Sequence, residues 1–546
     1  MFSRVFKNRL KAGVCRFSAD RGGQAAVTFA IAVLPILTGA GVAIDFSRIA
    51  TKHTSLQQAT DSAALAIAQS ATTATTSSNV LAQAQNYITT NYSNKSATVT
   101  SATISSDHSS VCVTAQDTVQ LGIMAMFNVT SKTVTASTCT AISGGASTYE
   151  IALVLDNSGS MNEAVSGNSK IAALRTAAGN FINTMFSGNF AGKVKMSVVP
   201  FAGTVSVSST DTSNGTAAWI DSQGKSSWHW KTFSGATAAG FTSRLDIFNK
   251  LKGVNSSWAW AGCFETQPYP QNVSDTIPSA STPDSLYVPY LSPDEVDPKQ
   301  YQSQNYQNSY LDDTPSTGCS GTTPTSDQGL LTRACKYKNP SITSTNTYGP
   351  NGMCLSQPLL RMTSAQATLT SKVNGLTANG DTNLHEGFMW GWRSVSPNAP
   401  FSDGKAYDTS AAAANQKVIV LMTDGYNNWS AVPNTWGGSM YEAPGYFTLA
   451  NGRMPPGNQN ITSLQQSRAA LDELTLEACT NAKGKGIIIY TVGFSISSDP
   501  IDTQGQNLLA SCATDSAHAF IANDANSLSN AFNQIGIGMG KLRIKS

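Results

Sequence analysis

The 546-residue chain has little charge and no concentration of one sign. Asp, Glu, Lys and Arg make up 12% of it, and the formal net charge is +2. A nucleic-acid-binding protein needs a concentrated basic surface, so the composition argues against nucleic acid as a partner. The chain also lacks H-E-x-x-H, G-x-S-x-G and P-loop motifs, and its five histidines are scattered. Since these common signatures of enzyme chemistry are missing, we expect a protein that is not an enzyme.

No C-x-x-C pair occurs among the nine cysteines, so a zinc or thioredoxin-like site has little support. Cys15 lies in a basic N-terminal segment, and the other eight follow an apolar stretch. This even number is consistent with four disulfides in an oxidising compartment. Proximity in the sequence favours Cys112–Cys139 and Cys479–Cys512. Four cysteines of a central segment remain, and their pairing stays open: Cys263, Cys319, Cys335 and Cys354.

One apolar stretch is long enough to matter for location. Residues 25–44 contain no charged side chain and follow a basic segment. Twenty residues in a helix span about 30 Å, the thickness of a hydrocarbon core. We predict a cytoplasmic segment at 1–22 and a single-pass anchor at 23–45, with the C-terminal region outside the cytoplasm. A cleavable signal peptide is the alternative, because Gly-Val-Ala at 41–43 is a passable cleavage site.

The most informative run is YEIALVLDNSGSMNE at 149–163. A strand over 151–155 is expected to deliver Asp156, Ser158 and Ser160 into one tight turn. One carboxylate and two hydroxyls at alternate positions are hard oxygen donors converging on one point, which suits Mg²⁺, Mn²⁺ or Ca²⁺. A Ser/Gly-rich turn without a metal is the alternative interpretation.

Two further segments carry matching side chains. KVIVLMTDGYNN at 417–428 predicts a buried strand that ends near Asp424, and NGDTNLHEGFMWGW at 379–392 places Thr382 on a loop that opens a helix. The alternation of strands and helices predicts a doubly wound, Rossmann-like α/β sheet. Ligand sites of such sheets lie beyond the carboxyl ends of the strands, so we expect Asp156, Thr382 and Asp424 on one rim.

This combination resembles the von Willebrand factor A domain and its metal-ion-dependent adhesion site, D-x-S-x-S with a distant Thr and Asp. The resemblance implies that 149–546 form such a domain with a divalent cation as cofactor, Mg²⁺ first and Mn²⁺ or Ca²⁺ as alternatives. The implied metal ligands are Asp156, Ser158, Ser160, Thr382 and Asp424. Since only two of the five donors are carboxylates, the cation would keep positive character and prefer an Asp or Glu carboxylate of a protein partner.

A second run, RGGQAAVTFAIAVLPILTGAGVAIDFSRIATKHTSLQQATDSAALAIAQ, resembles the N-terminus of TadE/TadG-like Flp (tight adherence) pilus-assembly proteins. The likeness covers about residues 20–70 and implies a pilin-like anchor, followed over 46–145 by a helix and a small mixed α/β module. Gly23 is followed at the processing offset by Thr28, where pseudopilin members carry Glu. TadG-like members commonly join this anchor to a von Willebrand A domain, so the two resemblances support each other.

A long insertion interrupts the predicted A domain at about 205–358. It holds four cysteines and many aromatic residues. Loops of this length are usually functional or have structure of their own. It either shapes or covers the partner surface, or it is a disulfide-stapled decoration with its own small core. Its acidic stretch, Asp294, Glu295 and Asp297, is expected to be a solvated loop, with a Ca²⁺ site as the alternative.

The leading hypothesis is a membrane-anchored, divalent-metal-dependent adhesion or assembly protein of a Tad/Flp pilus system, binding a pilus or secretion component. A structural envelope scaffold with a non-adhesive metal site is one alternative, and a metal-dependent envelope hydrolase is another. No general base is evident beside the predicted site. His385 is interpreted as a surface or packing residue, and Glu386 as a charge that favours its helix N-terminus.

Overall fold

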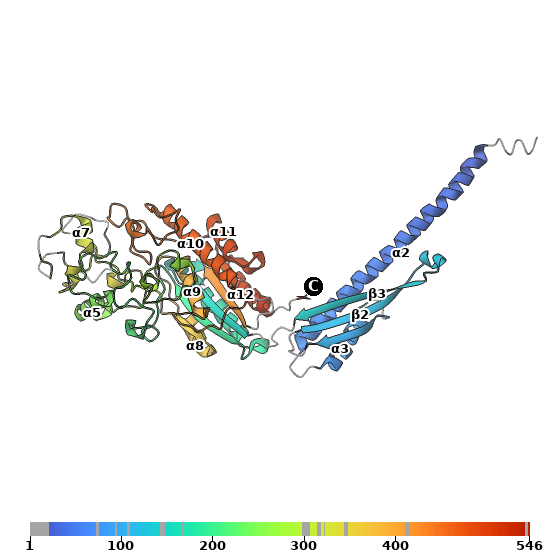
Figure 1. Cartoon of the computed structure of the whole chain (residues 1–546), viewed down its shortest axis with the longest axis horizontal. Coiled ribbons are helices and arrows are strands. Elements are labelled where there is room, and N and C mark those ends of the chain that lie inside the picture. The colour runs from blue at the N-terminus through green and yellow to red at the C-terminus, as the bar shows by residue number, and fades with distance from the viewer. Residues whose placement is uncertain are drawn as a thin grey trace, which may run out of the picture. The chain divides into compact units, whose positions relative to one another are not determined.

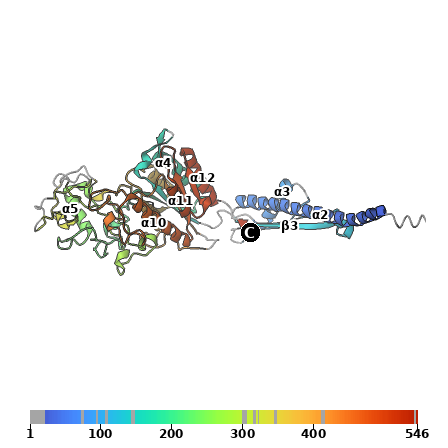
Figure 2. The same ribbon diagram turned by 90° about the horizontal axis from the view of Figure 1, so that it is seen from above.

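The computed structural model describes most of the chain (Figures 1 and 2). The described ranges are 21–71, 76–92, 96–105, 110–141, 148–165, 167–297, 306–313, 318–320, 323–342, 348–409, 415–540 and 544–545. Two compact units divide the chain: 1–146 together with 541–546, and 147–540. The predicted cytoplasmic segment lies outside the described residues, apart from Arg21 and Gly22.

The first unit packs two helices on one face of an antiparallel sheet, and Figure 2 shows α2 and α3 over β3. The helices are α2 (Arg21–Ser70) and α3 (Ser77–Asn91). The strands are β1 (Thr98–Ile104), β2 (Ser110–Gln120) and β3 (Ser131–Ala141), in the order β1-β2-β3. This module follows the mixed helix and strand pattern predicted for 46–145.

Apolar side chains at helical and strand spacing build the core of this unit. Helix α3 buries Val80, Ala84 and Ile88, which recur every four residues and so share one face. Strand β2 buries Val111 and Val113, whose alternate spacing points both toward the helices. They pack against the second half of α2.

The predicted anchor at 25–44 falls in the first part of α2. Among the helices as far as they are described, none combines the length and the apolar character needed to cross a membrane. Within this part of α2, residues 21–28, 30 and 34–38 are described only as helix, without their side chains.

Four disulfides are present among the described residues. Cys112–Cys139 and Cys479–Cys512 form as predicted, and the central cysteines pair as Cys263–Cys354 and Cys319–Cys335. Cys112 and Cys139 are directly opposite each other on β2 and β3, so the strand register itself brings these two cysteines together.

The last strand of the chain belongs to a different unit from the one predicted. Residues 149–546 were expected to form one domain, but β12 (Ile544–Lys545) pairs with Cys139 and Thr140 of β3 and belongs to the first unit. A two-residue strand has no periodicity of its own, so the sequence carries no signal for this return.

The second unit is built on a six-stranded sheet in the order β11-β10-β9-β4-β7-β8. Its strands are parallel except for the edge strand β8, which is antiparallel to β7. The strands are β4 (Thr148–Asp156), β7 (Val194–Phe201), β8 (Leu360–Thr363), β9 (Asn415–Thr423), β10 (Ile488–Phe494) and β11 (Ala519–Ala522). Strand β8 was not predicted, because its four residues are half-buried and show no alternation.

Helices cover both faces of this sheet. Ile151 and Leu153 of β4 face a core shared with α4 (Lys170–Met185), α8 (Gln366–Asn374) and α12 (Ala525–Gly540). Ala152 and Val154 face the opposite core, formed with α9 (Leu384–Val395), α10 (Leu464–Gly484) and α11 (Thr503–Cys512). The predicted α/β class is confirmed, with the sheet wound on both sides.

The insertion lies between β7 and β8 and has a core of its own. Its helices α5 (Arg244–Val254) and α7 (Asp327–Thr332) are joined by long irregular segments. Phe233, Phe248 and Tyr337 are among the buried residues of its separate apolar cluster. Trp219 also packs against Trp390 of α9, so the insertion is fused to the main domain as well as internally packed.

The acidic stretch of the insertion is buried, so the prediction of a solvated loop is wrong for Asp294 and Glu295. Asp294 accepts hydrogen bonds from the backbone N–H groups of Tyr310 and Leu311 and pairs with Lys336 at 2.8 Å. Burial raises the pKa of Asp294 to about 6, against the opposing effect of Lys336. These partners come from distant segments, which a local sequence pattern does not reveal.

Helix α9 approaches the sheet closely through glycine. A Cβ atom on Gly387 would lie 2.5 Å from the ring of Phe201, so we expect Gly387→Ala to lower the free energy of unfolding by about 1–3 kcal/mol through overpacking. Gly179 on α4 has open space around it, and Gly179→Ala should raise that free energy by about 0.5–1 kcal/mol. Urea unfolding of the two variants measures both effects, and equal effects would contradict the close approach.

Candidate metal centre

The site begins where two neighbouring parallel strands end. Strands β4 and β9 pair in parallel, with Leu155 opposite Met422, so Asp156 and Asp424 emerge at the same edge of the sheet. The hydroxyl of Thr423, the last residue of β9, donates a 2.6 Å hydrogen bond to Asp156 Oδ2. Both carboxylates are buried. The strand register alone therefore brings two acidic side chains to one rim.

The serine turn after β4 is fixed by backbone contacts. Ser158 N donates to Asp156 Oδ1 at 2.8 Å, and Gly159 N donates to the carbonyl of Gly380 at 2.8 Å. A Cβ atom on Gly159 would lie 3.3 Å from that same carbonyl, so glycine permits the close approach. Asn157 donates to the carbonyl of Thr377 at 3.0 Å. The turn is thus joined to the loop that precedes α9.

A chain of hydroxyls connects the serine turn to the second carboxylate. Ser158 Oγ lies 3.1 Å from Ser160 Oγ, and Ser160 Oγ donates to Asp424 Oδ1 at 2.8 Å. Two residues that are 264 positions apart in the sequence are therefore in direct contact.

Thr382 reaches the same rim from the loop before α9. Asn428 N donates to the Thr382 carbonyl at 2.8 Å, and Asn383 N donates to the Ala202 carbonyl at 2.9 Å. A Cβ atom on Gly425 would lie 3.9 Å from Thr382 Oγ1, so this hydroxyl faces the segment directly after Asp424. All five residues singled out by the sequence thus occupy one rim.

A buried lysine, absent from the predicted ligand set, completes the cluster. Lys170 Nζ lies 2.7 Å from Asp424 Oδ2 and 2.5 Å from Asp499 Oδ2, and its side chain is fully buried. Lys170 opens α4, where the helix dipole disfavours a cation. No motif in the sequence links Lys170 to these partners, which lie 254 and 329 residues away.

Burial controls the electrostatics of these groups. Burial, with the nearby Asp424 adding to it, raises the pKa of Asp156 to about 7. Burial also raises the pKa of Asp424, although Lys170 opposes this shift. For Lys170, burial favours the neutral form, but Asp424 and Asp499 outweigh it, and its pKa lies above the ordinary value. The raised pKa values of the two carboxyl groups indicate that one ammonium group does not balance both of them in their ionised form.

The donor set fits a hard divalent cation in its chemistry. It offers carboxylate and hydroxyl oxygens, and no sulfur or imidazole. Within the described ranges, no group of three or more His, Cys, Asp or Glu side chains is placed to hold a metal. A cation at this rim would therefore depend on Ser and Thr hydroxyls, water and an incoming ligand to complete its coordination.

His385 and Glu386, which come shortly after Thr382 in the sequence, are engaged elsewhere. His385 is buried, and its Nε2 lies 2.7 Å from the carbonyl of Asn272. Glu386 accepts a hydrogen bond from the hydroxyl of Thr266 at 2.5 Å. The packing interpretation of His385 is confirmed, and both side chains connect α9 to the insertion.

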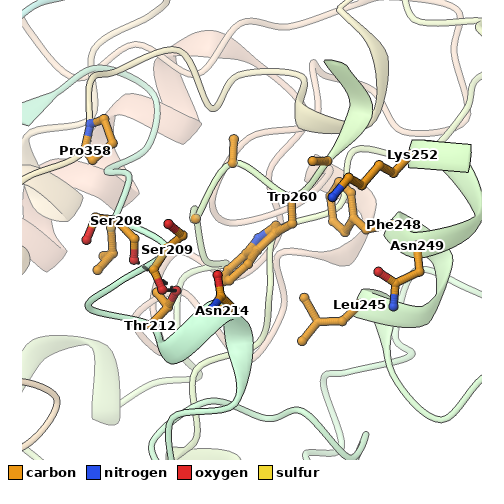
Figure 3. Close-up of a pocket in the computed structure, with 14 residues that line it drawn as sticks. Ser208, Ser209, Thr212, Asn214, Leu245, Phe248, Asn249, Lys252, Trp260 and Pro358 are labelled. Atoms are coloured by element: carbon orange, nitrogen blue, oxygen red, sulfur yellow. Dashed lines mark hydrogen bonds between the residues drawn. The ribbon is translucent and has the colours of Figure 1, made fainter. Parts of the chain in front are cut away.

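The insertion carries a separate pocket of about 480 Å³ (Figure 3). The ring of Trp260 lies at its centre, between Asn214 and the α5 side chains Asn249 and Lys252. Its lining includes none of the five predicted metal ligands. The second unit thus has an acidic rim at the end of the sheet and, separately, a pocket built around the ring of Trp260.

A family comparison agrees with the N-terminal resemblance. Residues 23–70 match the model of the Tad family, described as Flp pilus-assembly TadE/G-like. The N-terminal part of the chain is therefore a TadE/G-like segment. A search of the curated proteins gave no match.

Solved structures with some likeness to the chain include three pilus proteins. The pilus adhesin SpaC from Lactobacillus rhamnosus GG has a TM-score of 0.34 and 12% identity over 82% of this chain and 34% of SpaC. The vWF domain of the type V pili tip protein Mfa5 from Porphyromonas gingivalis has a TM-score of 0.31 and 13% identity, covering 72% of this chain and 95% of that domain. The adhesive tip pilin GBS104 from Group B Streptococcus agalactiae has a TM-score of 0.33 and 12% identity, covering 72% of this chain and 99% of GBS104. This chain thus spans about a third of SpaC.

The buried carboxylate of Asp156 makes stability depend on pH when divalent cations are removed. Its pKa of about 7 in the folded protein exceeds that of an unfolded Asp, so the folded state retains a proton that the unfolded state has lost. In EDTA, the free energy of unfolding of the natural protein, relative to Asp156→Asn, should fall as the pH rises from about 4 to 7. Urea unfolding should show a decrease of about 1 kcal/mol or more. A difference that does not change with pH would contradict the assignment.

Proposed function

We propose that the protein is a membrane-anchored adhesion or assembly protein of a Tad/Flp pilus system, and that it binds a partner carboxylate through a divalent cation. The observation that carries the proposal is the contact between the serine turn and Asp424 through Ser160 Oγ. It supports the proposal because it brings the D-x-S-x-S turn and the distant Asp424 together at a single rim. Asp156, Ser158, Ser160, Thr382 and Asp424 would supply the ligands.

Mg²⁺ is the cation we propose first, with Mn²⁺ and Ca²⁺ as alternatives. Three neutral hydroxyls and two carboxylates leave a bound cation with positive character and with places for water. One such place is where an Asp or Glu of a pilus or secretion component would bind. We infer no catalytic step, because the site offers no group placed to activate water.

The TadE/G-like segment supports the cellular setting of the proposal. It contains the apolar stretch 25–44, which we propose as the anchor in the bacterial inner membrane, with the N-terminus in the cytoplasm. The four disulfides all lie C-terminal to this stretch, and they support a periplasmic or extracellular location for that part of the chain.

A structural scaffold is the second candidate, and the burial of Asp156 and Asp424 favours it. A cation that only balances these two buried carboxylates would stabilise the fold without presenting a site to a partner. The two candidates differ in whether the cation changes an interaction with another protein.

Partner capture should require both the cation and Asp156. We expect the full-length protein to retain envelope proteins from its own cell in Mg²⁺ and to lose them in EDTA, because the carboxylate contact runs through the metal. Asp156→Ala should lose at least about tenfold in apparent affinity, the equivalent of about 1.4 kcal/mol. Pull-down with quantitative mass spectrometry measures the loss.

Glu163→Ala is the matched control, since Glu163 is an exposed acid three residues beyond the serine turn. It should retain the natural capture. Capture that persists in EDTA and in Asp156→Ala would remove the metal from the function. A cation that raises the melting temperature but leaves capture unchanged would favour the scaffold.

A further inference from the structure

The tip of the β2–β3 hairpin exposes large apolar side chains. In the loop between these strands, Met126 is 80% exposed, Phe127 62% and Val129 41%. We call Met126, Phe127 and Val129 the apolar tip. Soluble surfaces rarely gather large apolar side chains in this way without a partner. The segment 118–131 that includes the apolar tip contains no acidic residue.

The hairpin tip is fastened to α2 at a defined level. The carboxylate of Asp45 accepts hydrogen bonds from the backbone N–H groups of Gly122, Ile123 and Met124, at 3.0, 2.8 and 2.9 Å. A Cβ atom on Gly41 would lie 2.3 Å from Ile123, so the helix and the loop are in close contact there. The loop cannot slide along α2 without breaking three hydrogen bonds.

This level coincides with the end of the proposed anchor. The apolar stretch ends at residue 44, one position before Asp45. In Figure 1 the N-terminal part of α2 continues past the hairpin with no strand beside it. Ile44 and Phe46 of α2 are also exposed, at 61% and 70%. The apolar tip therefore lies where an anchored helix would leave the hydrocarbon core.

Cationic side chains lie on the side away from the anchor. Arg48 and Lys52 line a pocket of about 420 Å³ together with residues 118–120 of β2. Lys132 is exposed and lies opposite Val119 in the strand pairing. The nearby acids Asp45 and Asp117 are buried and pair with these cations: Lys52 Nζ lies 2.8 Å from Asp117 Oδ2, and Arg48 Nη1 lies 3.8 Å from Asp45 Oδ1. The Arg48 side chain is still 56% exposed, so its guanidinium group is open to a further anion. An apolar tip below a cationic pocket matches the acyl and headgroup levels of a membrane interface.

We propose that the apolar tip inserts into the outer interface of the membrane and that the Arg48 pocket binds the phosphate of an anionic lipid. This second contact rests on the proposed anchor and fixes the orientation of the first unit on the membrane. The occupant is a lipid surface: the tip adjoins the apolar stretch, and its flank carries cations.

A fluorescent probe on the apolar tip tests this contact in the full-length protein. Phe127→Cys in a Cys15→Ser background is labelled with an environment-sensitive dye and reconstituted into phosphatidylcholine vesicles with or without phosphatidylglycerol. We expect quenching by spin-labelled lipid at least twice that of the matched control Leu81→Cys. Leu81 is 42% exposed on α3, which packs on β1 away from the hairpin tip.

The other arms separate the sources of binding. Arg48→Gln should abolish the extra quenching that phosphatidylglycerol produces, and free phosphate should not compete with the vesicles. Quenching no greater at 127 than at 81 would overturn the proposal, as would dye self-quenching that shows a second copy covering the tip. Extraction with alkaline carbonate reports on the anchor separately: protein retained in the membrane with an unquenched tip would sink this inference and leave the anchor standing.

Discussion

Two carboxylates buried at the end of a parallel sheet constrain everything around them. Asp156 and Asp424 come from adjacent strands, so the same pairing that builds the sheet also forces like charges together. A buried charge is costly unless a proton, an ammonium group or a metal balances it. Lys170 balances part of the negative charge of Asp424, and the serine turn donates a hydrogen bond to it. The serine turn and the start of α4 both contact Asp424, and the loop before α9 is joined to the turn by a backbone hydrogen bond.

The strands with an uninterrupted run of apolar residues could be predicted from the sequence. The predicted strand at 151–155 lies within β4, and the strand predicted to end near Asp424 is β9, which ends at Thr423. The same signal placed the carboxylates at strand ends. Lys170 was missed as a site residue because its partner Asp499 lies 329 residues away in a loop without a motif. The structure of the insertion could not be predicted from the sequence, because contacts between distant segments hold it together.

The insertion shows how a chain with few charges uses them inside the fold. Glu265 is buried between Arg244 and Arg453, and Tyr441 donates a hydrogen bond to it. Burial acts to raise the pKa of Glu265, but the two guanidinium groups outweigh it, and the pKa lies below its ordinary value. Arg453 belongs to the segment that follows Asp424 in the sequence, so this ion cluster joins the insertion to that segment.

In the proposed function, the charge of the rim would connect cation binding to partner binding. With both carboxylates ionised, the buried set of Asp156, Asp424 and Lys170 carries one net negative charge, because two carboxylates face one ammonium group. Asp499 is 42% exposed, so water screens much of its charge. A divalent cation would turn the set positive by one charge, and one partner carboxylate would then neutralise it. Lys170 would thus weaken the binding of the cation alone and favour the binding of the partner carboxylate. Each ligand would favour the other, since coupling between two sites is reciprocal.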